Sequence, residues 1–386
     1  MSADTPLRSF FMAGFECSSH RRPDGERLDL IAATAHDRLA LEDYRSCSDF
    51  GLLTIRDGLR WHLIEREDGS YDWSSWVPML EAAAEAGVQV IWDLFHYGSP
   101  DHIDRGSPAF IEAYARFAAE AVRVHRAVTG TAPIVCPINE ISYLTWAMRT
   151  GYFTPAGPDE PGWLGRHLVS AALAGVRAMR AVEPECRFLW AEPLIHVAGN
   201  PGDADHARRA EEKRQSQFHA YDMLTGASAP ELGGSPDVID LLGVNYYSDN
   251  QWYFEGSTIP LGHHAYRPLR EMLGEWWQRF HRPILIAETG AEGSARASWL
   301  HYVCGEVRAA MAERVPVEGI CLYPVLDYHG WDNDRVCATG LLSGADTSGR
   351  RQTHLPLAEE LKAQAIRFTS AETAFRQLSP SLEVAA

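Results

Sequence analysis

Eight short apolar segments alternate with longer amphipathic segments along this chain of 386 residues, and the alternation restricts the folds open to it. Short apolar runs bounded by turn residues are typical of strands buried on both faces, as in parallel sheets. The expected strands are residues 10–15, 52–56, 88–95, 133–138, 187–191, 238–244, 283–287 and 317–323. Helical periodicity predicts helices at residues 36–50, 74–86, 108–128, 164–182, 203–224, 266–280, 294–314 and 355–368. Eight strand–helix units in one chain predict an α/β fold with a single closed (β/α)8 TIM barrel.

An open, doubly wound sheet is the competing fold. Such a sheet normally carries a glycine-rich turn after its first strand, and residues 14–18 (GFECS) fit no dinucleotide-binding pattern. The barrel is expected to occupy residues 1–370, with residues 371–386 as a C-terminal tail or packing segment, because apolar periodicity is lost there. Long loops after the first, fourth, sixth and eighth strands place the elaborated face at the carboxyl ends of the strands.

Composition opposes several classes of function. The net charge of −17 opposes nucleic acid and anionic membranes as partners. We find no apolar run long enough for a signal peptide or a membrane span. The seven cysteines are scattered without a CxxC pair, which favours buried free thiols in a reducing cytoplasm. The sequence contains no HxH or HExxH motif, so we expect neither a metal nor another cofactor.

Two of the apolar segments end in a glutamate, Glu140 after the fourth expected strand and Glu288 after the seventh. In an eight-stranded barrel these two strand ends face each other across the top. Two carboxyl groups about 5 Å apart suit a retaining glycosidase, with one as the nucleophile and the other as the acid/base. The acid has to stay protonated near neutral pH while the nucleophile stays ionised. The sequence therefore predicts a two-carboxylate site.

Six blocks of the chain, in the same order, resemble the motifs of family 1 glycoside hydrolases, in clan A. Residues 137–140 (PINE) resemble the T-L-N-E-P motif of that family, and residues 285–290 (LIAETG) resemble its I-T-E-N-G. Residues 240–247 (DLLGVNYY) resemble D-F-L-G-I-N-Y-Y. The other blocks are residues 55–61, 94–100 and 326–331. The resemblance implies a retaining β-glycosidase on a single barrel, without a cofactor.

The resemblance also implies a role for each matching residue. Glu288 would be the nucleophile and Glu140 the acid/base. Asn139 would bind the sugar 2-hydroxyl, and His96 would bind another ring hydroxyl. The remaining implied site residues are Arg56 and Tyr247, which would hold the nucleophile ionised, Asn245 on the sixth strand, Tyr323 as the platform under the sugar, and Trp331 as a wall of the same subsite.

The chain departs from the family where sugar hydroxyls are recognised. The family's glutamine on the first loop has no clear match, and the candidates to replace it are Arg21, His20 and Glu16. An arginine there would imply an acidic sugar. Gly330 stands where the family has a glutamate before the strand-eight tryptophan, and Asp332 or Asp334 is expected to replace it. These departures leave the identity of the glycone open.

We therefore expect a cytoplasmic, β-glucosidase-like retaining O-glycosidase that acts on a small-molecule glycoside or oligosaccharide. Two alternatives stay open. One is a transglycosidase, in which an acceptor replaces water at the same site. The other is a non-catalytic carbohydrate-binding barrel, which predicts sugar binding without hydrolysis; two intact carboxylates disfavour it.

Overall fold

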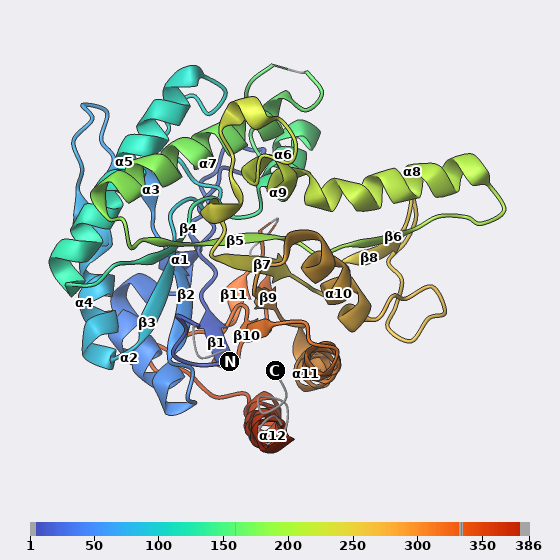
Figure 1. The fold of residues 1–386 in the computed structure, drawn as a ribbon. Helices are drawn as coiled ribbons and strands as arrows, with labels where there is room; N and C mark the ends of the chain where they lie inside the picture. The colour runs from blue at the N-terminus through green and yellow to red at the C-terminus, as the bar shows by residue number, and fades with distance from the viewer. Residues whose placement is uncertain (1–4, 159, 332, 334, 379–386) are drawn as a thin grey trace, which may run out of the picture.

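Eight parallel strands close into a barrel in the computed structural model, which describes residues 5–158, 160–331, 333 and 335–378 (Figure 1). Around the barrel the strands follow the order β1–β2–β3–β4–β5–β7–β9–β10, and β10 pairs with β1 to close the sheet. Their bounds are β1 (Phe11–Gly14), β2 (Thr54–Gly58), β3 (Gln89–Asp93), β4 (Ile134–Cys136), β5 (Arg187–Pro193), β7 (Leu241–Asn245), β9 (Ile284–Thr289) and β10 (Val317–Leu322). Each expected strand overlaps one of these, so the predicted (β/α)8 barrel is confirmed.

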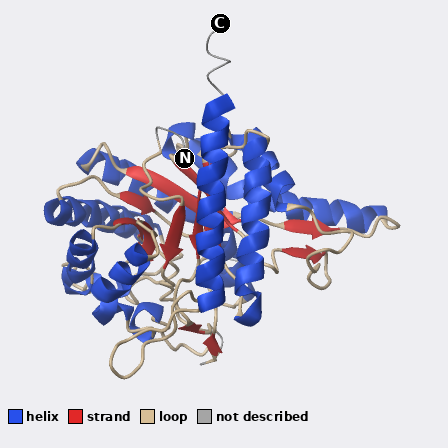
Figure 2. Ribbon diagram, turned by 90° about the horizontal axis from the view of Figure 1, so that it is seen from below, coloured by secondary structure: helices blue, strands red, loops and turns tan. Residues whose placement is uncertain are grey.

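The outer layer consists of helices that follow the strands (Figures 1 and 2). The longer ones are α2 (His36–Asp49), α4 (Val77–Ala86), α5 (Pro108–Thr129), α7 (Trp163–Val182), α10 (Leu269–Phe280), α11 (Arg296–Ala312) and α12 (Leu355–Leu378). Their ends carry the expected signals: Pro108 opens α5, and Gly87 and Gly130 end α4 and α5 in the left-handed conformation. None of the helices in the described part of the chain has the length and apolar character needed to cross a membrane.

One expected helix, residues 203–224, is divided. It forms α8 (Ala204–Gln215), a 3-10 turn (Ser216–Phe218) and α9 (His219–Leu224). Helix α9 buries Tyr221 and Leu224 against the barrel, whereas α8 is mostly charged and buries only Ala210. With β6 (His196–Ala198) and β8 (Gln251–Tyr253), which pair in parallel, α8 forms an arm that projects from the side of the barrel (Figures 1 and 2).

Several short elements have no counterpart among the expected ones. Helix α6 (Ile141–Thr150) begins directly after Glu140. The others are α1 (Leu30–Ala33), α3 (Trp61–Ile64), the hairpin β11 (Tyr328–His329) and β12 (Val336–Cys337), and 3-10 turns at Trp73–Ser75, Pro230–Leu232, Pro236–Val238 and Gly293–Ala295. Helix α12 runs past the expected domain boundary at residue 370. Residues 379–386 lie outside the described residues, so that boundary stays a prediction.

Side chains fill the barrel interior, which places any open site at the ends of the strands. The inner cluster is Met12, Ile91, Ile134, Cys136, Leu189, Ala191, Leu241, Leu285, Ala287, Cys321 and Tyr323, with Leu7. A larger apolar layer separates the strands from the helices. All seven cysteines are buried and unpaired, as expected.

Candidate active site

A cavity of about 1170 Å³ opens at the carboxyl ends of the barrel strands. It exceeds the usual range for small-molecule sites, which is about 300–1,000 Å³. Side chains from the ends of many strands line its inner part: Glu16, His96, Tyr97, Glu140, Tyr247, Glu288, Tyr323 and Trp331. Most of the residues predicted to form the site therefore meet around one cavity, although they come from distant parts of the sequence.

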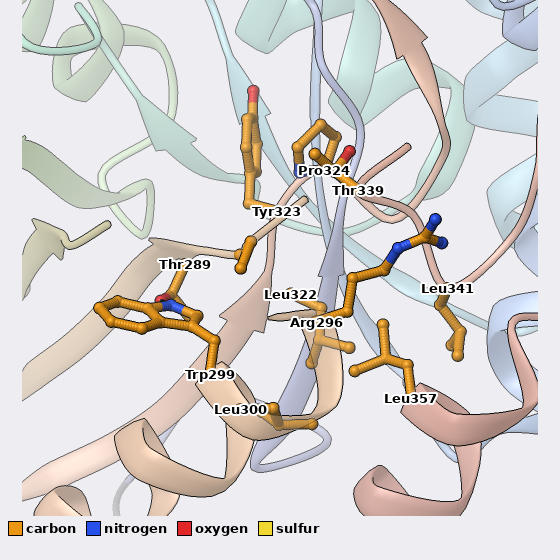
Figure 3. A pocket seen from close by; sticks show the side chains of 12 residues that line it. Thr289, Arg296, Trp299, Leu300, Leu322, Tyr323, Pro324, Thr339, Leu341 and Leu357 are labelled. Carbon is orange, nitrogen blue, oxygen red and sulfur yellow. The ribbon is translucent and has the colours of Figure 1, made fainter. Parts of the chain in front are cut away.

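A second cavity lies beside the first, between the ends of β9 and β10 and helices α11 and α12 (Figure 3). Its volume of about 20 Å³ is close to the space of one water molecule. Thr289, Trp299, Leu300 and Leu357 contribute to its walls, and Tyr323 borders both cavities. The small cavity is part of the packing that supports the site and has no room for a sugar.

Glu288 is the second-last residue of β9, and its carboxylate accepts from two donors. Arg56 Nη1 donates to Oε1 at 2.6 Å, and the Tyr247 hydroxyl donates to Oε2 at 2.8 Å. Arg56 is itself fully buried, and its Nε and Nη2 bind the two oxygens of Asp93 at 3.0 and 2.7 Å. This bidentate ion pair with Asp93 fixes the plane of the guanidinium group. Arg56 therefore presents Nη1 to Glu288 in one orientation.

Glu140 follows β4 and is the residue from which α6 begins. Its backbone is left-handed, with φ at 46°, and its N–H donates to the Ala191 carbonyl at 2.9 Å. A left-handed non-glycine residue is uncommon and often marks a functional site. The Tyr97 hydroxyl donates to Glu140 Oε2 at 2.5 Å, and Asn245 Nδ2 donates to Oε1 at 2.8 Å. Burial, together with the charge of Glu288, raises the pKa of Glu140 to about 7.

A continuous series of hydrogen bonds connects the two carboxyl groups. Arg56, bound to Glu288, donates from Nη2 to Asn139 Oδ1 at 2.6 Å. Asn139 Nδ2 donates to the Tyr97 hydroxyl at 2.9 Å, and Tyr97 donates to Glu140. The expected pair of strand-end glutamates is thus brought together at one site.

Strand register brings the pair together independently of this series. Asn245 on β7 is the register partner of Glu288 on β9, and its side chain reaches Glu140. Asn245, Asn139 and Arg56 are nearly or fully buried, so they lie behind the side chains that line the cavity.

His96 and Tyr323 form the floor of the cavity beside Glu288. His96 Nδ1 lies 2.8 Å from Asp93 Oδ2. The rings of His96 and Tyr323 are parallel, with their centroids 6.4 Å apart. Burial opposes the charged form of His96, but Asp93 and Glu16 outweigh it and raise the pKa. A Cβ on Gly14 would lie 2.1 Å from the Tyr323 ring, so glycine is required where this ring crosses the end of β1.

Trp331 lines the cavity from the loop after β11 and packs among Tyr97, Tyr143 and Phe153, with ring centroids 5.7–6.1 Å away. Asp332 and Asp334 lie outside the described residues, so the expected substitute for the missing glutamate is not placed.

Of the three first-loop candidates, Glu16 is the one that lines the cavity. Arg21 instead binds Asp101 through Nε at 2.7 Å and the Gly25 carbonyl through Nη1 at 2.6 Å. His20 is buried against the ring of Phe153. Among the described residues, Arg21 is therefore a surface ion pair and Glu16 the polar group that faces the site.

Sequence reasoning did not single out Asp93 or Tyr97, which position Arg56 and Glu140. Both left a signal: Asp93 is a carboxylate near the end of the expected strand at residues 88–95, and Tyr97 lies inside one of the six blocks. Glu192, a third strand-end glutamate, accepts from the Ser142 N–H at 3.1 Å and so caps α6. Burial raises the pKa of Glu192 to about 8.

One cluster has metal-ligand character. The ligand atoms of Cys17, Asp93 and His96 lie within 4.8 Å of one another, and all three residues are buried. Both Asp93 oxygens already accept from Arg56, whose positive charge opposes a cation at the same place. The donor set therefore does not suit a metal ion.

The chain is similar to known proteins in its three-dimensional structure. No protein-family model and no curated protein matches the chain by sequence. A family 1 β-glucosidase from Thermotoga maritima, in complex with isofagomine lactam, has a TM-score of 0.71 over 93% of this chain and 97% of that chain, at 14% identity. The AHE enzyme from Alicyclobacillus herbarius has a TM-score of 0.74 over 94% and 98%, at 16% identity. The β-glycosidase BGL167 has a TM-score of 0.70 over 87% of each chain, at 18% identity. The chain therefore has the (β/α)8 fold of the family 1 β-glucosidases, which is the fold that the resemblance of the six sequence blocks implies.

Proposed function

We propose that the chain is a retaining β-glycosidase with Glu288 as the nucleophile and Glu140 as the acid/base. The observation that carries this proposal is the contrast between two carboxyl groups in one cavity. Glu288 accepts hydrogen bonds from a guanidinium and a phenol, one at each of its oxygens. Glu140, with its pKa raised to about 7, is substantially protonated near neutral pH. This division is the one that double displacement needs.

In the first step a Glu288 carboxylate oxygen attacks the anomeric carbon of a bound glycoside. The bond from that carbon to the aglycone oxygen breaks, and its electron pair stays on the oxygen. Glu140 gives its proton to this oxygen, so the aglycone leaves as a neutral alcohol or phenol. The product is a glycosyl ester of Glu288.

In the second step Glu140, now a carboxylate, takes a proton from a water molecule whose oxygen attacks the same carbon. The ester bond breaks, Glu288 regains its charge, and Glu140 regains its proton. Two inversions leave the product with the β configuration of the substrate.

The remaining residues are assigned to binding and positioning. His96, Tyr323 and Trp331 line the cavity and would contact the sugar directly. Asn139 would reach the sugar 2-hydroxyl from just behind this wall. Arg56, Tyr247 and Asn245 act through the two glutamates that they hold.

The proposed substrate is a small β-glycoside or oligosaccharide, with β-glucoside-like chemistry as the working class. Two of the similar T. maritima structures are complexes with glucoimidazole and deoxynojirimycin, so those proteins bind sugar analogues. A cytoplasmic location remains a prediction, supported by seven buried, unpaired cysteines.

Glu288→Ala and Glu140→Ala test the two roles with a 2,4-dinitrophenyl β-glycoside. Glu288→Ala should lose at least about 1,000-fold in kcat/KM, and azide should restore turnover with an α-glycosyl azide as product. Glu140→Ala with azide should give the β-glycosyl azide, since the nucleophile is intact. Glu212→Ala, on the exposed face of α8, is the control and should keep full activity.

Two results would overturn the proposal: full activity in Glu288→Ala, or an α anomer as the first product seen by proton NMR in the wild type. Product analysis with an added acceptor alcohol separates hydrolysis from glycosyl transfer. Calorimetric sugar binding without turnover of any glycoside would instead identify a non-catalytic binding barrel.

A further inference from the structure

Glu16, two residues after β1, is a buried carboxylate that the proposed mechanism does not use. Its exposed fraction is 8%, and it lines the same cavity as Glu140 and Glu288. Its Oε1 accepts from the Ser18 N–H at 3.0 Å and from the Ser18 hydroxyl at 2.5 Å. Within the described part of the chain, Oε2 has no hydrogen-bond donor. One oxygen is thus fixed by the protein and the other is left for a ligand.

No arginine or lysine of the described chain neutralises this carboxylate. Its only ion-pair contact there is His96, whose Nε2 lies 3.9 Å from Oε1. His96 already binds Asp93, and Arg56 is shared by Asp93 and Glu288. Three carboxylates therefore face at most two cations among the described residues, and this side of the cavity keeps a net negative charge.

The hydroxyl of Tyr323 is a second unpartnered polar group among the described residues that line this cavity. It is buried and has no hydrogen-bond partner among the described residues. Burial is the main cause that raises the pKa of this phenol, with smaller contributions from Cys17 and Glu16. Buried polar groups normally have a partner, so two unpartnered ones among the residues that line one cavity indicate that the cavity takes a polar ligand group.

The order of Asn139, His96 and Glu16 indicates which position of the sugar ring carries that ligand group. Asn139 Nδ2 lies 3.1 Å from His96 Nε2, and His96 Nε2 lies 3.9 Å from Glu16. If Asn139 binds the 2-hydroxyl, as the proposed function assigns, His96 and Glu16 follow along ring positions 3 and 4.

Resting on that proposed function, we propose that Glu16 selects the glycone and that the glycone carries an ammonium group at ring position 3 or 4. An ammonium donates charge-assisted hydrogen bonds to the open Glu16 oxygen and supplies the missing positive charge. A hydroxyl would supply the hydrogen bond but leave a buried, uncompensated anion, which is costly. Burial raises the pKa of Glu16, because the charged carboxylate is poorly solvated inside the protein. An acidic sugar is disfavoured, because Arg21 is bound to Asp101 and a sugar carboxylate would face Glu16.

The test compares 4-nitrophenyl β-glucoside with its 3-amino-3-deoxy and 4-amino-4-deoxy analogues. For the wild type, kcat/KM for one amino analogue should exceed that for the neutral glucoside by at least about tenfold. Glu16→Gln keeps the size of the side chain and removes its charge, so the ratio should fall by at least about tenfold. Glu16→Asp keeps the charge and should retain a preference for the amine.

Glu292→Gln is the matched control, because Glu292 borders the same cavity but is paired with Arg335. It should leave the ratio unchanged. If the wild type prefers the neutral glucoside over both amino analogues, the inference is wrong and the glycosidase proposal is unaffected. This comparison uses the wild type alone, so it does not depend on the folding of any variant. A wild type that cleaves none of the three overturns this inference together with the β-glucoside-like substrate class of the proposed function.

Discussion

At the scale of single residues, the protonation of Glu140 depends on a few named contacts. Burial and the charge of Glu288 raise its pKa to about 7, whereas the hydrogen bonds from Tyr97 and Asn245 lower it. A donor to a carboxylate stabilises the ionised form, so its removal raises the pKa further. A substitution of a neighbouring side chain should therefore shift the pKa of Glu140.

Tyr97→Phe should extend activity to higher pH. Glu140 has to be protonated to assist the leaving group, so kcat/KM for a poor leaving group should fall as pH rises through about 7 in the wild type. Without the Tyr97 hydroxyl this alkaline limb should move upward by about one pH unit, the scale of a hydrogen bond to a charged group. The measurement is kcat/KM against pH for phenyl and 2,4-dinitrophenyl glycosides.

The dinitrophenyl substrate is the control, since its leaving group needs no proton and its profile should lack the limb in both proteins. A limb that stays in place or moves to lower pH in Tyr97→Phe would show that another group sets it.

At the scale of elements, the packing of α5 on α7 supports the site from outside the barrel. The Tyr114 ring of α5 lies against Gly175 of α7, and its hydroxyl donates to the carbonyl of Pro137, just before Asn139. A Cβ on Gly175 would approach this ring to 2.7 Å. The space left by one glycine therefore allows the two helices and the end of β4 to fit together.

Gly175→Ala and Gly305→Ala should have opposite effects on stability. Alanine favours a helix over glycine by about 1 kcal/mol, and Gly305 in α11 has open space where the Cβ would lie, so Gly305→Ala should stabilise. At Gly175 the clash with Tyr114 should outweigh that gain, with a net loss of about 1–3 kcal/mol. Urea unfolding midpoints measure both. A stabilised Gly175→Ala would mean that the Tyr114 ring moves aside without cost.

The elements that the sequence predicted are those with a local signal. The eight apolar runs correspond to the eight barrel strands. A strand that is buried on both faces shows in the sequence as a few consecutive apolar residues, so it can be recognised locally. Helix α6 was missed because the residue before it, Glu140, is left-handed and provides no side-chain cap, so no start signal precedes the helix. The break between α8 and α9 was missed because no glycine or proline marks it.

The two catalytic candidates were predictable because each closes a buried strand. Their partners Arg56 and Asn245 were expected only from the resemblance of the sequence blocks, because Arg56 and Glu288 are separated by 232 residues and Asn245 and Glu140 by 105. The choice between Arg21 and Glu16 depended on Asp101, which lies 80 residues beyond Arg21 and binds it at the surface. The contact between Arg21 and Asp101 follows from the closed barrel and leaves no trace in a short motif.

At the scale of the whole molecule, the barrel supplies the inner part of the cavity and the inserted segments supply its outer part. The outer lining includes Trp146 of α6, Ile195 before β6, Met223 of α9 and Trp252 of β8. Trp252 packs on the small apolar cluster of the projecting arm, and Trp146 is 46% exposed. Under the proposed function, this apolar rim faces the aglycone, whereas the barrel residues face the glycone.

Trp252→Ala should therefore affect only the steps in which the aglycone is present. Loss of an aromatic contact should lower kcat/KM for 4-nitrophenyl glycosides by about tenfold. For a dinitrophenyl glycoside, hydrolysis of the glycosyl-enzyme limits kcat, and the aglycone has already left, so kcat should stay within about twofold. Trp277→Ala, on α10 and away from the cavity lining, is the matched control and should change neither constant. An equal loss in both constants for Trp252→Ala would show that the arm supports the catalytic pair itself, and the division between barrel and inserted segments would then be wrong.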